Sequence, residues 1–435
     1  MKAGLPVPAR AQVASAATAT AHNMPTRTIA ITTSMSARPR RLPRWDTVVS
    51  PITAGACKLC GIPAFARRRC LPALLAAILA CGEAATAPPS TPPPPTTTQP
   101  VDLSADWVTT TPGAQGVDAA ALATGLGGAA GIPGLRSILV VRHGRLISEQ
   151  YMAPGGADSL YALRSVTKSV MSLLVGSAIQ RGAIRGTDQT LGELFRPPLP
   201  SLDPADAAIT VGDLLTMTGG FQWNESGVTE YNNWVLAPDQ IDYLLARPIV
   251  SPPGSTFNYN SAAVHLLSAV LEVDGGGTAA FADSVLLAPL GIHARDWELD
   301  DRGIPNGGAG LYLRPRDMAK IGQLVLQRGR SGATEVVPPS WVDEATRNHV
   351  HTGTTLGAYG LLQYGDLFWL GSAAGHAFVL ATGYGGQEVY VVPDLDLVVV
   401  TTATWQGLGT GAQAQTTAIA GLIVNGILPA VRSTQ

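Results

Sequence analysis

The strongest chemical signal in the sequence is a serine three residues before a lysine, at Ser165 and Lys168. Lysine is scarce in this chain: after residue 100 there are 16 arginines but only two lysines, Lys168 and Lys320. Arginine can supply surface charge, but it cannot lose its proton near neutral pH, whereas lysine can. A lysine kept in such an arginine-rich chain suggests a chemical role. Lys168 is therefore a candidate general base, and Ser165 is a candidate nucleophile.

The position of this pair on a helix favours that chemistry. The apolar spacing after Ser165 predicts a helix that ends near Gly182. Residues three apart share one helix face, and both the positive helix N-terminus and burial disfavour a charged ammonium group. Lowering the pKa of a lysine from about 10.4 to about 7.5 requires roughly 4 kcal/mol of differential interaction. The alternative is an N-capping serine beside a solvated lysine, because the spacing alone is a short pattern.

The elements that must position this pair are predicted as strands, then helices, then strands. Residues 135–142 and 145–151 flank a His143-Gly144 turn and predict a hairpin. Helical periodicity follows at 165–182, 210–217, 261–272 and 317–327. Strands return at 388–392 and 397–402, before a last apolar helix at about 412–427. We therefore predict an α+β fold, in which one antiparallel sheet is built from both chain ends with packed helices and a mostly helical middle region.

Charge divides the chain into two parts. Residues 1–100 hold 11 Lys+Arg and 2 Asp+Glu, whereas the remaining 335 residues hold 18 and 29. The net charges are therefore +9 and −11. An acidic body of this size can bury a full core, and it lacks the basic footprint of a nucleic-acid-binding protein. All four cysteines lie before residue 100, so the body contains neither a disulfide nor a cysteine metal site.

Residues 1–81 are expected to be a leader with a signal-like segment. Three arginines at 67–69 precede about ten apolar residues, which are the basic and hydrophobic parts of a secretory signal. The segment ends Ile78-Leu79-Ala80-Cys81, which resembles the lipobox of bacterial lipoproteins, and Thr/Pro-rich residues 82–101 predict an extended linker. Because signals begin at residue 1, one interpretation is that translation starts downstream and that the first 50 or so residues are an over-extended reading frame. The alternative is a buried apolar helix after a disordered tail.

The surroundings of Ser165 resemble the nucleophile motif of the serine β-lactamase and penicillin-binding-protein superfamily. The likeness is greatest to its class C branch, with related esterases and 6-aminohexanoate-dimer hydrolases, and it extends over residues 102–435. The similar segments occur in the family's order, at 163–170, 210–220, 253–261, 307–320 and 381–387. The resemblance implies a β-lactamase/transpeptidase-like domain with Ser165 as acylated nucleophile and Lys168 as general base. It implies that Tyr259 shares the proton with the lysine and delivers it to the leaving group; the alternative is a core tyrosine.

Two positions depart from the family pattern. Ser261 stands where class C members usually carry asparagine, and it could equally be the N-cap of the following helix. The family's Lys/His-Thr-Gly is Ala381-Thr382-Gly383 here, so the cation that meets a β-lactam carboxylate is missing. The resemblance assigns the oxyanion hole to the main-chain N–H groups of Ser165 and Tyr384, with a register one residue either way left open. Gly383 and Ser261 complete the candidate oxyanion and substrate-binding set. Efficient β-lactamase activity is not expected.

We therefore expect a serine hydrolase that cleaves a small-molecule ester or amide through an acyl-enzyme intermediate, as a carboxylesterase or a 6-aminohexanoate-dimer-type amidase. No metal or organic cofactor and no nucleic-acid partner is implied. The leader predicts a protein of the bacterial cell envelope or periplasm that is lipid-anchored to the membrane at Cys81; an intact Met1 in the mass spectrum of the cell-derived protein would contradict this. The rival hypothesis is a non-catalytic envelope binding protein that retains the fold, motivated by Ala381 and Ser261. A purely structural surface lipoprotein has only the leader in its favour.

Overall fold

A computed structural model describes residues 100–226, 229–409 and 411–431 of the chain. The expectations for the leader over 1–81, including Cys81, and for nearly all of the linker over 82–101 lie outside the described residues and stay predictions. Among the described residues, none of the helices is both long enough and apolar enough to cross a membrane.

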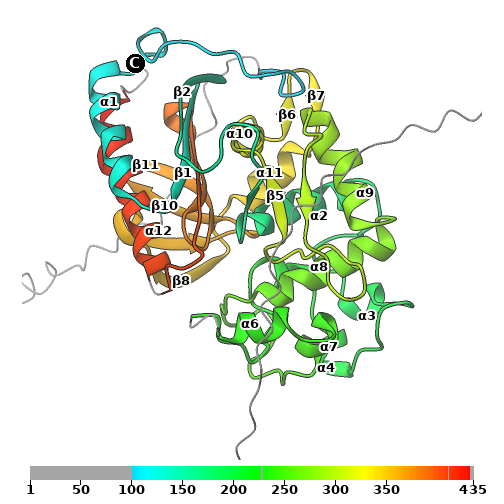
Figure 1. Cartoon of the computed structure of the whole chain (residues 1–435). Coiled ribbons are helices and arrows are strands. Elements are labelled where there is room, and N and C mark those ends of the chain that lie inside the picture. Colours follow the sequence, from blue (N-terminus) through cyan, green and yellow to red (C-terminus); the bar gives the residue numbers. More distant parts are fainter. Residues whose placement is uncertain (1–99, 227–228, 410, 432–435) are drawn as a thin grey trace, which may run out of the picture. The chain divides into compact units, whose positions relative to one another are not determined.

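The centre of the fold is an eight-stranded sheet in which every pair of neighbouring strands is antiparallel. Its strand order is β2-β1-β13-β12-β11-β10-β9-β8 (Figure 1). In that order the strands are β2 (Arg145–Tyr151), β1 (Leu135–Arg142), β13 (Leu397–Ala403), β12 (Gln387–Val392), β11 (His376–Gly383), β10 (Trp369–Ala373), β9 (Leu361–Tyr364) and β8 (Val350–Thr355). Early and late segments of the chain meet at the β1–β13 pair, which confirms the predicted antiparallel sheet built from both ends.

The predicted hairpin is formed by β1 and β2. Its two turn residues, His143 and Gly144, have φ values of 49° and 68°, as in the two-residue turns whose twist matches that of the flanking strands. Beyond the hairpin, Leu139 lies opposite Val400 and Val141 opposite Val398. The side chains of β13 are buried on both faces of the sheet, which explains its continuous run of β-branched residues.

Helices cover both faces of the sheet. On one face lie α1 (Ala119–Gly127), α12 (Gly411–Gly421) and the helical turn Leu422–Ile427 that continues α12. On the other face, α10 (Pro315–Leu326) packs against β12 and β13, and α2 (Val166–Gln180) packs against β11 and β12. The sheet therefore has a hydrophobic core on each side.

The middle of the chain is mostly helical, as predicted, and lies to one side of the sheet (Figure 1). Its helices are α3 (Leu191–Leu194), α4 (Pro204–Ala207), α5 (Val211–Leu215), α6 (Thr229–Val235), α7 (Gln240–Leu245), α8 (Ser261–Asp274) and α9 (Thr278–Ala282), and α11 (Pro339–Ala345) follows α10. Two small sheets contain β3 (Tyr161–Ala162), β5 (Leu311–Leu313) and β4 (Asp296–Trp297), and β6 (Arg330–Ser331) with β7 (Thr334–Glu335).

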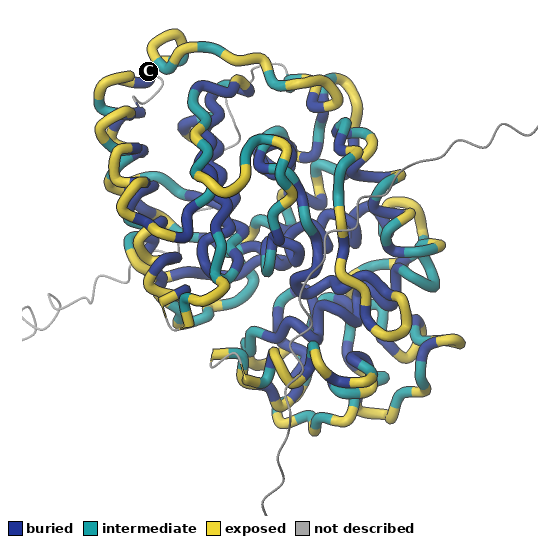
Figure 2. The backbone as a smooth tube through the Cα atoms, viewed as in Figure 1, coloured by how far each residue is buried: buried dark blue, intermediate teal, exposed yellow. Residues whose placement is uncertain are grey.

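Helix α2 is buried on all sides, whereas its sequence predicts a single apolar face. Every residue from Val166 to Ala178 is buried, because α2 packs against the sheet, α8 and α11. Figure 2 shows that the buried backbone is concentrated where the sheet meets the helical region. Small residues make this possible: a Cβ at Gly176 would lie 2.2 Å from the ring of Trp341. A helix that is buried on all sides lies in the core of the domain, and this is the position of α2.

Strands β8, β9 and β10 were not predicted from the sequence. In β8 the side chains alternate between exposed and half-buried positions and are mostly polar, which gives a weak hydrophobic pattern. These strands form one edge of the sheet, where β10 pairs with β11, β9 with β10 and β8 with β9. The formation of these three strands therefore depends on tertiary pairing rather than on a local sequence pattern.

Candidate active site

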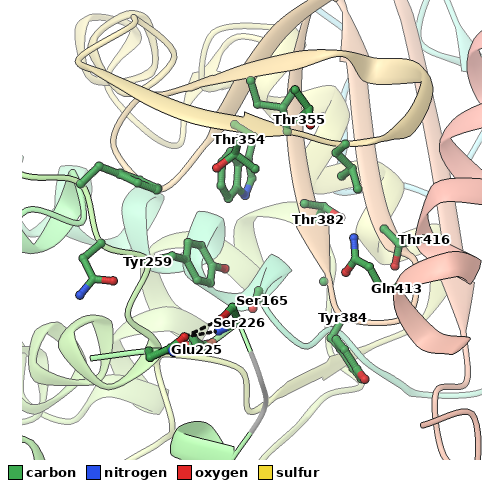
Figure 3. A pocket seen from close by; sticks show the side chains of 17 residues that line it. Ser165, Glu225, Ser226, Tyr259, Thr354, Thr355, Thr382, Tyr384, Gln413 and Thr416 are labelled. Carbon is green, nitrogen blue, oxygen red and sulfur yellow. Dashed lines mark hydrogen bonds between the residues drawn. The ribbon is translucent and has the colours of Figure 1, made fainter. Parts of the chain in front are cut away.

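Ser165 lies at the N-terminus of α2 and lines a pocket of about 410 Å³ (Figure 3). In Figure 3, Tyr259 and Glu225 lie on one side of Ser165, and Thr382, Gln413 and Thr416 lie on the other. The other lining residues are Asn224, Ser226, Phe257, Asn258, Thr354, Thr355, Leu356, Leu362, Trp369, Gly383 and Tyr384. Among these described lining residues, Glu225 is the one charged side chain, and none is a histidine.

The Lys168 ammonium group is enclosed by three acceptors. Its side chain is 1% exposed, and Nζ lies 2.9 Å from Ser165 Oγ, 2.8 Å from Ser261 Oγ and 2.7 Å from the Gly308 carbonyl oxygen. An ammonium group has three N–H donors, so each donor has one partner. The predicted adjacency of Ser165 and Lys168 is present in the structure, and the alternative of a solvated lysine does not describe it. Ser165 also makes no side-chain capping bond to α2.

Burial lowers the pKa of Lys168 to about 8, from an ordinary value of 10.5. Burial is the largest cause; the negative charge of Glu225 acts in the opposite direction, and the positive charge of Arg164 lowers the pKa further. A shift of this size corresponds to about 3 kcal/mol between the two protonation states. A buried amine with this pKa exchanges its proton near neutral pH, as a general base must.

Tyr259 lies in the segment before α8 and lines the pocket. Lys168 Nζ is 4.8 Å from the centre of the Tyr259 ring, and the ring of Trp369 stacks on that of Tyr259 with 5.6 Å between their centres. Burial and the charge of Glu225 raise the pKa of the Tyr259 phenol well above its ordinary value, although a hydrogen-bonding interaction with Ser165 opposes this shift. The phenol therefore keeps its proton in the range where Lys168 titrates, and it is suited to donate rather than to accept.

Ser261 is not the N-cap of α8. The cap is Asn260, whose Oδ1 accepts a hydrogen bond from the Ala263 N–H at 3.0 Å. Ser261 is the first helical residue, it is fully buried, and it is absent from the described lining of the pocket. Its hydroxyl lies between Lys168 Nζ and the Glu225 carboxylate instead. The interpretation of Ser261 as the N-cap is therefore wrong. Its hydroxyl contacts Lys168 and Glu225 and does not line the pocket.

Glu225 is a site residue that sequence reasoning missed. It accepts three hydrogen bonds: from the Ser261 hydroxyl at 2.5 Å, from the Ser261 N–H at 2.7 Å and from the Trp223 indole N–H at 3.0 Å. The Asn258 side-chain amide donates to the carbonyls of Phe221 and Trp223 and so holds this segment beside Tyr259. Glu225 lies in an irregular loop with no periodicity, 36 residues from Ser261, and no signal in the sequence connects the two.

The loop after β4 supplies the third acceptor for Lys168. The Gly308 carbonyl is fixed because Asn306 Oδ1 accepts from the N–H groups of Gly308 and Ala309 at 2.9 and 3.1 Å. A Cβ at residue 308 would lie 2.5 Å from the Ser261 carbonyl oxygen. Only glycine lets this loop approach α8 closely enough to reach the lysine.

The end of β11 lies beside the turn that carries Ser165. A Cβ at Gly383 would lie 2.4 Å from the Leu163 carbonyl oxygen, so glycine permits this contact between main chains. Gly383 and Tyr384 line the pocket with Ser165, as the oxyanion assignment requires, and the Tyr384 hydroxyl donates to the Gly409 carbonyl at 3.1 Å. Ala381, where the family has a cation, is buried in the core and absent from the described pocket lining.

With this geometry in place, comparison with known proteins identifies the family. The Beta-lactamase family model matches residues 119–422, which include every candidate site residue except those of the leader. The chain belongs to the Beta-lactamase family. This confirms the superfamily and the fold class that the motifs predict.

The relatives place this Beta-lactamase family member among hydrolases. Esterase EstB of Burkholderia gladioli is 30% identical over 179 residues, which span 36% of this chain and 45% of that esterase. A 6-aminohexanoate-dimer hydrolase of Paenarthrobacter ureafaciens is 25% identical over 290 residues, which span 62% and 72% of the two chains. The penicillin-binding protein of Bacillus halodurans shares the fold, with a TM-score of 0.53 and 17% identity over 68% of this chain and 98% of its own. The chain thus spans less than half the length of the first of these relatives, and the names of the first two are those of ester or amide hydrolases.

A buried acid, Glu388, lies behind the pocket of this Beta-lactamase fold. Glu388 on β12 is opposite Thr382 on β11, and its Oε2 accepts the Tyr359 hydroxyl at 2.5 Å. Burial raises the pKa of Glu388 to about 8, from an ordinary value of 4.5, and hydrogen bonds with Tyr359 and Thr382 only partly oppose this shift. At neutral pH the group is therefore a neutral acid.

We expect Glu388→Gln to remove a pH dependence of stability. Between pH 4.5 and 8 the folded state holds a proton that the unfolded state has lost, so the free energy of unfolding falls by about 1.4 kcal/mol per pH unit as pH rises. Glutamine keeps the shape without the charge. Urea titrations at pH 5, 6.5 and 8 should show a variant whose stability relative to the wild type increases with pH; parallel curves for the two proteins would contradict this.

Proposed function

We propose that this Beta-lactamase family member is a serine hydrolase that cleaves an ester or amide bond of a small, uncharged substrate through an acyl-enzyme intermediate. The observation that carries the proposal is the buried Lys168 amine, with a pKa of about 8, at 2.9 Å from Ser165 Oγ. A nucleophilic hydroxyl requires a base within hydrogen-bond reach whose pKa lies near the working pH. Lys168 meets both conditions.

In the acylation step, Ser165 Oγ bonds to the substrate carbonyl carbon and its proton passes to the neutral Lys168 amine. The bond from that carbon to the leaving alcohol or amine then breaks. The leaving group takes a proton from the Tyr259 phenol, which is reprotonated from Lys168. Water attacks the acyl-enzyme in the second half with the same groups in the reverse order, and it releases the acid and free Ser165. The oxyanion of each tetrahedral intermediate is assigned to the main-chain N–H groups of Ser165 and Tyr384, each such donor being worth roughly 3 kcal/mol.

The pocket supports a neutral substrate. Its described lining combines apolar side chains, such as Phe257, Trp369 and Leu362, with threonine hydroxyls and the amides of Asn224 and Gln413. This described lining contains no arginine or lysine that would bind a carboxylate, and Ala381, which stands where the family has a cation, is buried away from the cavity. Carboxylesterase activity fits this lining and the named activity of the first relative. The linear 6-aminohexanoate dimer carries an ammonium group and a carboxylate, so amidase activity of that type is motivated by the name of the second relative rather than by the lining.

Covalent capture tests this proposal directly. The full chain is incubated with a fluorophosphonate probe, and the labelled peptide is identified by mass spectrometry. We expect one phosphonate on Ser165, formed faster at pH 9 than at pH 7. Ser226 is the matched control serine, because it is exposed and lines the same pocket but makes no contact with Lys168; Ser226→Ala should be labelled like the wild type. Equal modification of Ser165 and Ser226, or none at all, would favour the non-catalytic binding protein.

A further inference from the structure

The Glu225 carboxylate is committed to the polypeptide rather than left free in the pocket. Two of its three hydrogen bonds come from Ser261, and the third comes from Trp223. The Glu225 carboxylate must be the acceptor in all three bonds, because a carboxylate accepts hydrogen bonds and does not donate them. The Ser261 hydroxyl must therefore donate its single hydrogen to Glu225 Oε1, and only its lone pairs remain for Lys168.

We propose that Glu225 is a positioning residue that fixes the direction of the Ser261 hydroxyl. Among the three described partners of Lys168 Nζ, this leaves Ser165 as the one able to donate a hydrogen bond to the neutral amine. The inference rests on the proposed function of Lys168 as the base. A neutral amine has two N–H donors and one lone pair. The Gly308 carbonyl accepts one N–H and Ser261 Oγ accepts the other. The lone pair is then directed to the remaining neighbour, Ser165 Oγ.

The serine at position 261 makes such an orienting group necessary. A hydroxyl can turn its hydrogen in either direction, so a free Ser261 could donate to the Lys168 lone pair and compete with Ser165 for it. An asparagine amide, which class C relatives usually carry at this position, presents donors and an acceptor in fixed places. In the Ser261–Glu225 pair, the carboxylate determines the direction in which the hydroxyl points its hydrogen.

Three groups with charge or a titratable proton act on the Lys168 amine. Glu225 raises its pKa, Arg164 at the preceding turn lowers it, and the Tyr259 ring faces it at 4.8 Å. The Arg164 guanidinium is itself held between the rings of Tyr231 and Trp405, at 5.0 and 4.9 Å. Among these groups, Glu225 carries the negative charge that stabilises the protonated lysine. Removing this charge should therefore lower the pKa of Lys168, so that the lysine loses its proton at lower pH.

Two variants separate the orientation of Ser261 from the charge of Glu225. Glu225→Gln removes the charge and offers an amide NH₂ that can turn the Ser261 hydroxyl toward Lys168. Glu225→Asp keeps the charge but shortens the reach to Ser261. Glu335→Gln is the control, because it removes one carboxylate charge at an exposed position that bonds to Gln180 and is absent from the described lining of the pocket. The readouts are the pH dependence of ester hydrolysis and the titration of Lys168 by NMR of ¹³C-lysine-labelled full chain, which contains only four lysines. Lys168→Met assigns the resonance.

We expect Glu225→Gln to reduce kcat by about 10- to 100-fold, with little change in KM, and to move the Lys168 titration to lower pH. Glu225→Asp should reduce kcat while leaving the titration near that of the wild type, and Glu335→Gln should change neither. Unchanged kcat and an unchanged titration in a folded Glu225→Gln protein would overturn the positioning role while the wild-type turnover still supports the proposed function. No wild-type turnover, with a titration that moves as expected, would reject the proposed function and keep the electrostatic contact of Glu225 with Lys168.

Discussion

Replacing Ser165 by alanine should abolish turnover, with kcat for a short-chain p-nitrophenyl ester reduced by at least about 10⁴-fold. Removing the nucleophile of a serine hydrolase leaves only the catalysis supplied by binding and by the oxyanion hole. The fold should survive, because Ser165 is half-buried and its side chain makes no capping bond to α2. The pocket should also keep its shape, since only one hydroxyl is removed.

The measurement compares the full-length wild type and Ser165→Ala in the same ester assay from pH 6 to 10. Ser226→Ala serves as the control for a hydroxyl lost from the same pocket. Circular dichroism and the melting temperature confirm that each variant is folded. Equal rates in the wild type and Ser165→Ala would remove Ser165 from the mechanism and leave the binding-protein hypothesis as the better account.

Replacing Lys168 by methionine should reduce kcat by about 10³-fold and remove the pH dependence that the lysine causes. In the proposed mechanism, Lys168 acts as the base in its neutral form. With a pKa of about 8, roughly a tenth of the molecules carry the neutral amine at pH 7 and about nine tenths at pH 9. The rate should therefore rise with pH through about 8 and then level off. In the variant this rise should be absent, and a residual rate that still rises with a midpoint near 8 would contradict the assignment.

The same substitution should change the pH dependence of stability with the opposite sign to Glu388→Gln. Between pH 8 and 10.5 the unfolded lysine holds a proton that the folded one has lost, so wild-type stability gains about 1.4 kcal/mol per pH unit from this group as pH rises. Methionine has a similar length and no charge to desolvate. Urea titrations at pH 7.5 and 10 should therefore show that the Lys168→Met variant is the more stable protein at pH 7.5 and that its advantage shrinks at pH 10.

The sequence by itself determined the candidate nucleophile and base and the outline of the fold. A serine and a scarce lysine at helical spacing identify Ser165 and Lys168, because residues one turn apart on a helix must lie close together. The β1–β2 hairpin and the strands β12 and β13 were predictable for the same reason, since alternation, apolar runs and turn residues act over a few positions. Helix α8 and the placement of Tyr259 before it also followed from local pattern and from the family resemblance.

Only the tertiary structure decided what surrounds the lysine. Glu225, Ser261 and Gly308 come from three loops or helix ends that are distant in sequence, and their contacts depend on how α8 and the loops around it pack against α2. The burial of α2 on every side, which lowers the pKa of Lys168, likewise results from packing between the sheet and the helical region. Local patterns report which face of a segment is apolar, but desolvation and charge are properties of everything that packs against a group. For that reason Ser165, Lys168 and Tyr259 could be predicted from the sequence, whereas Glu225 and the packing that sets the pKa of Lys168 could not.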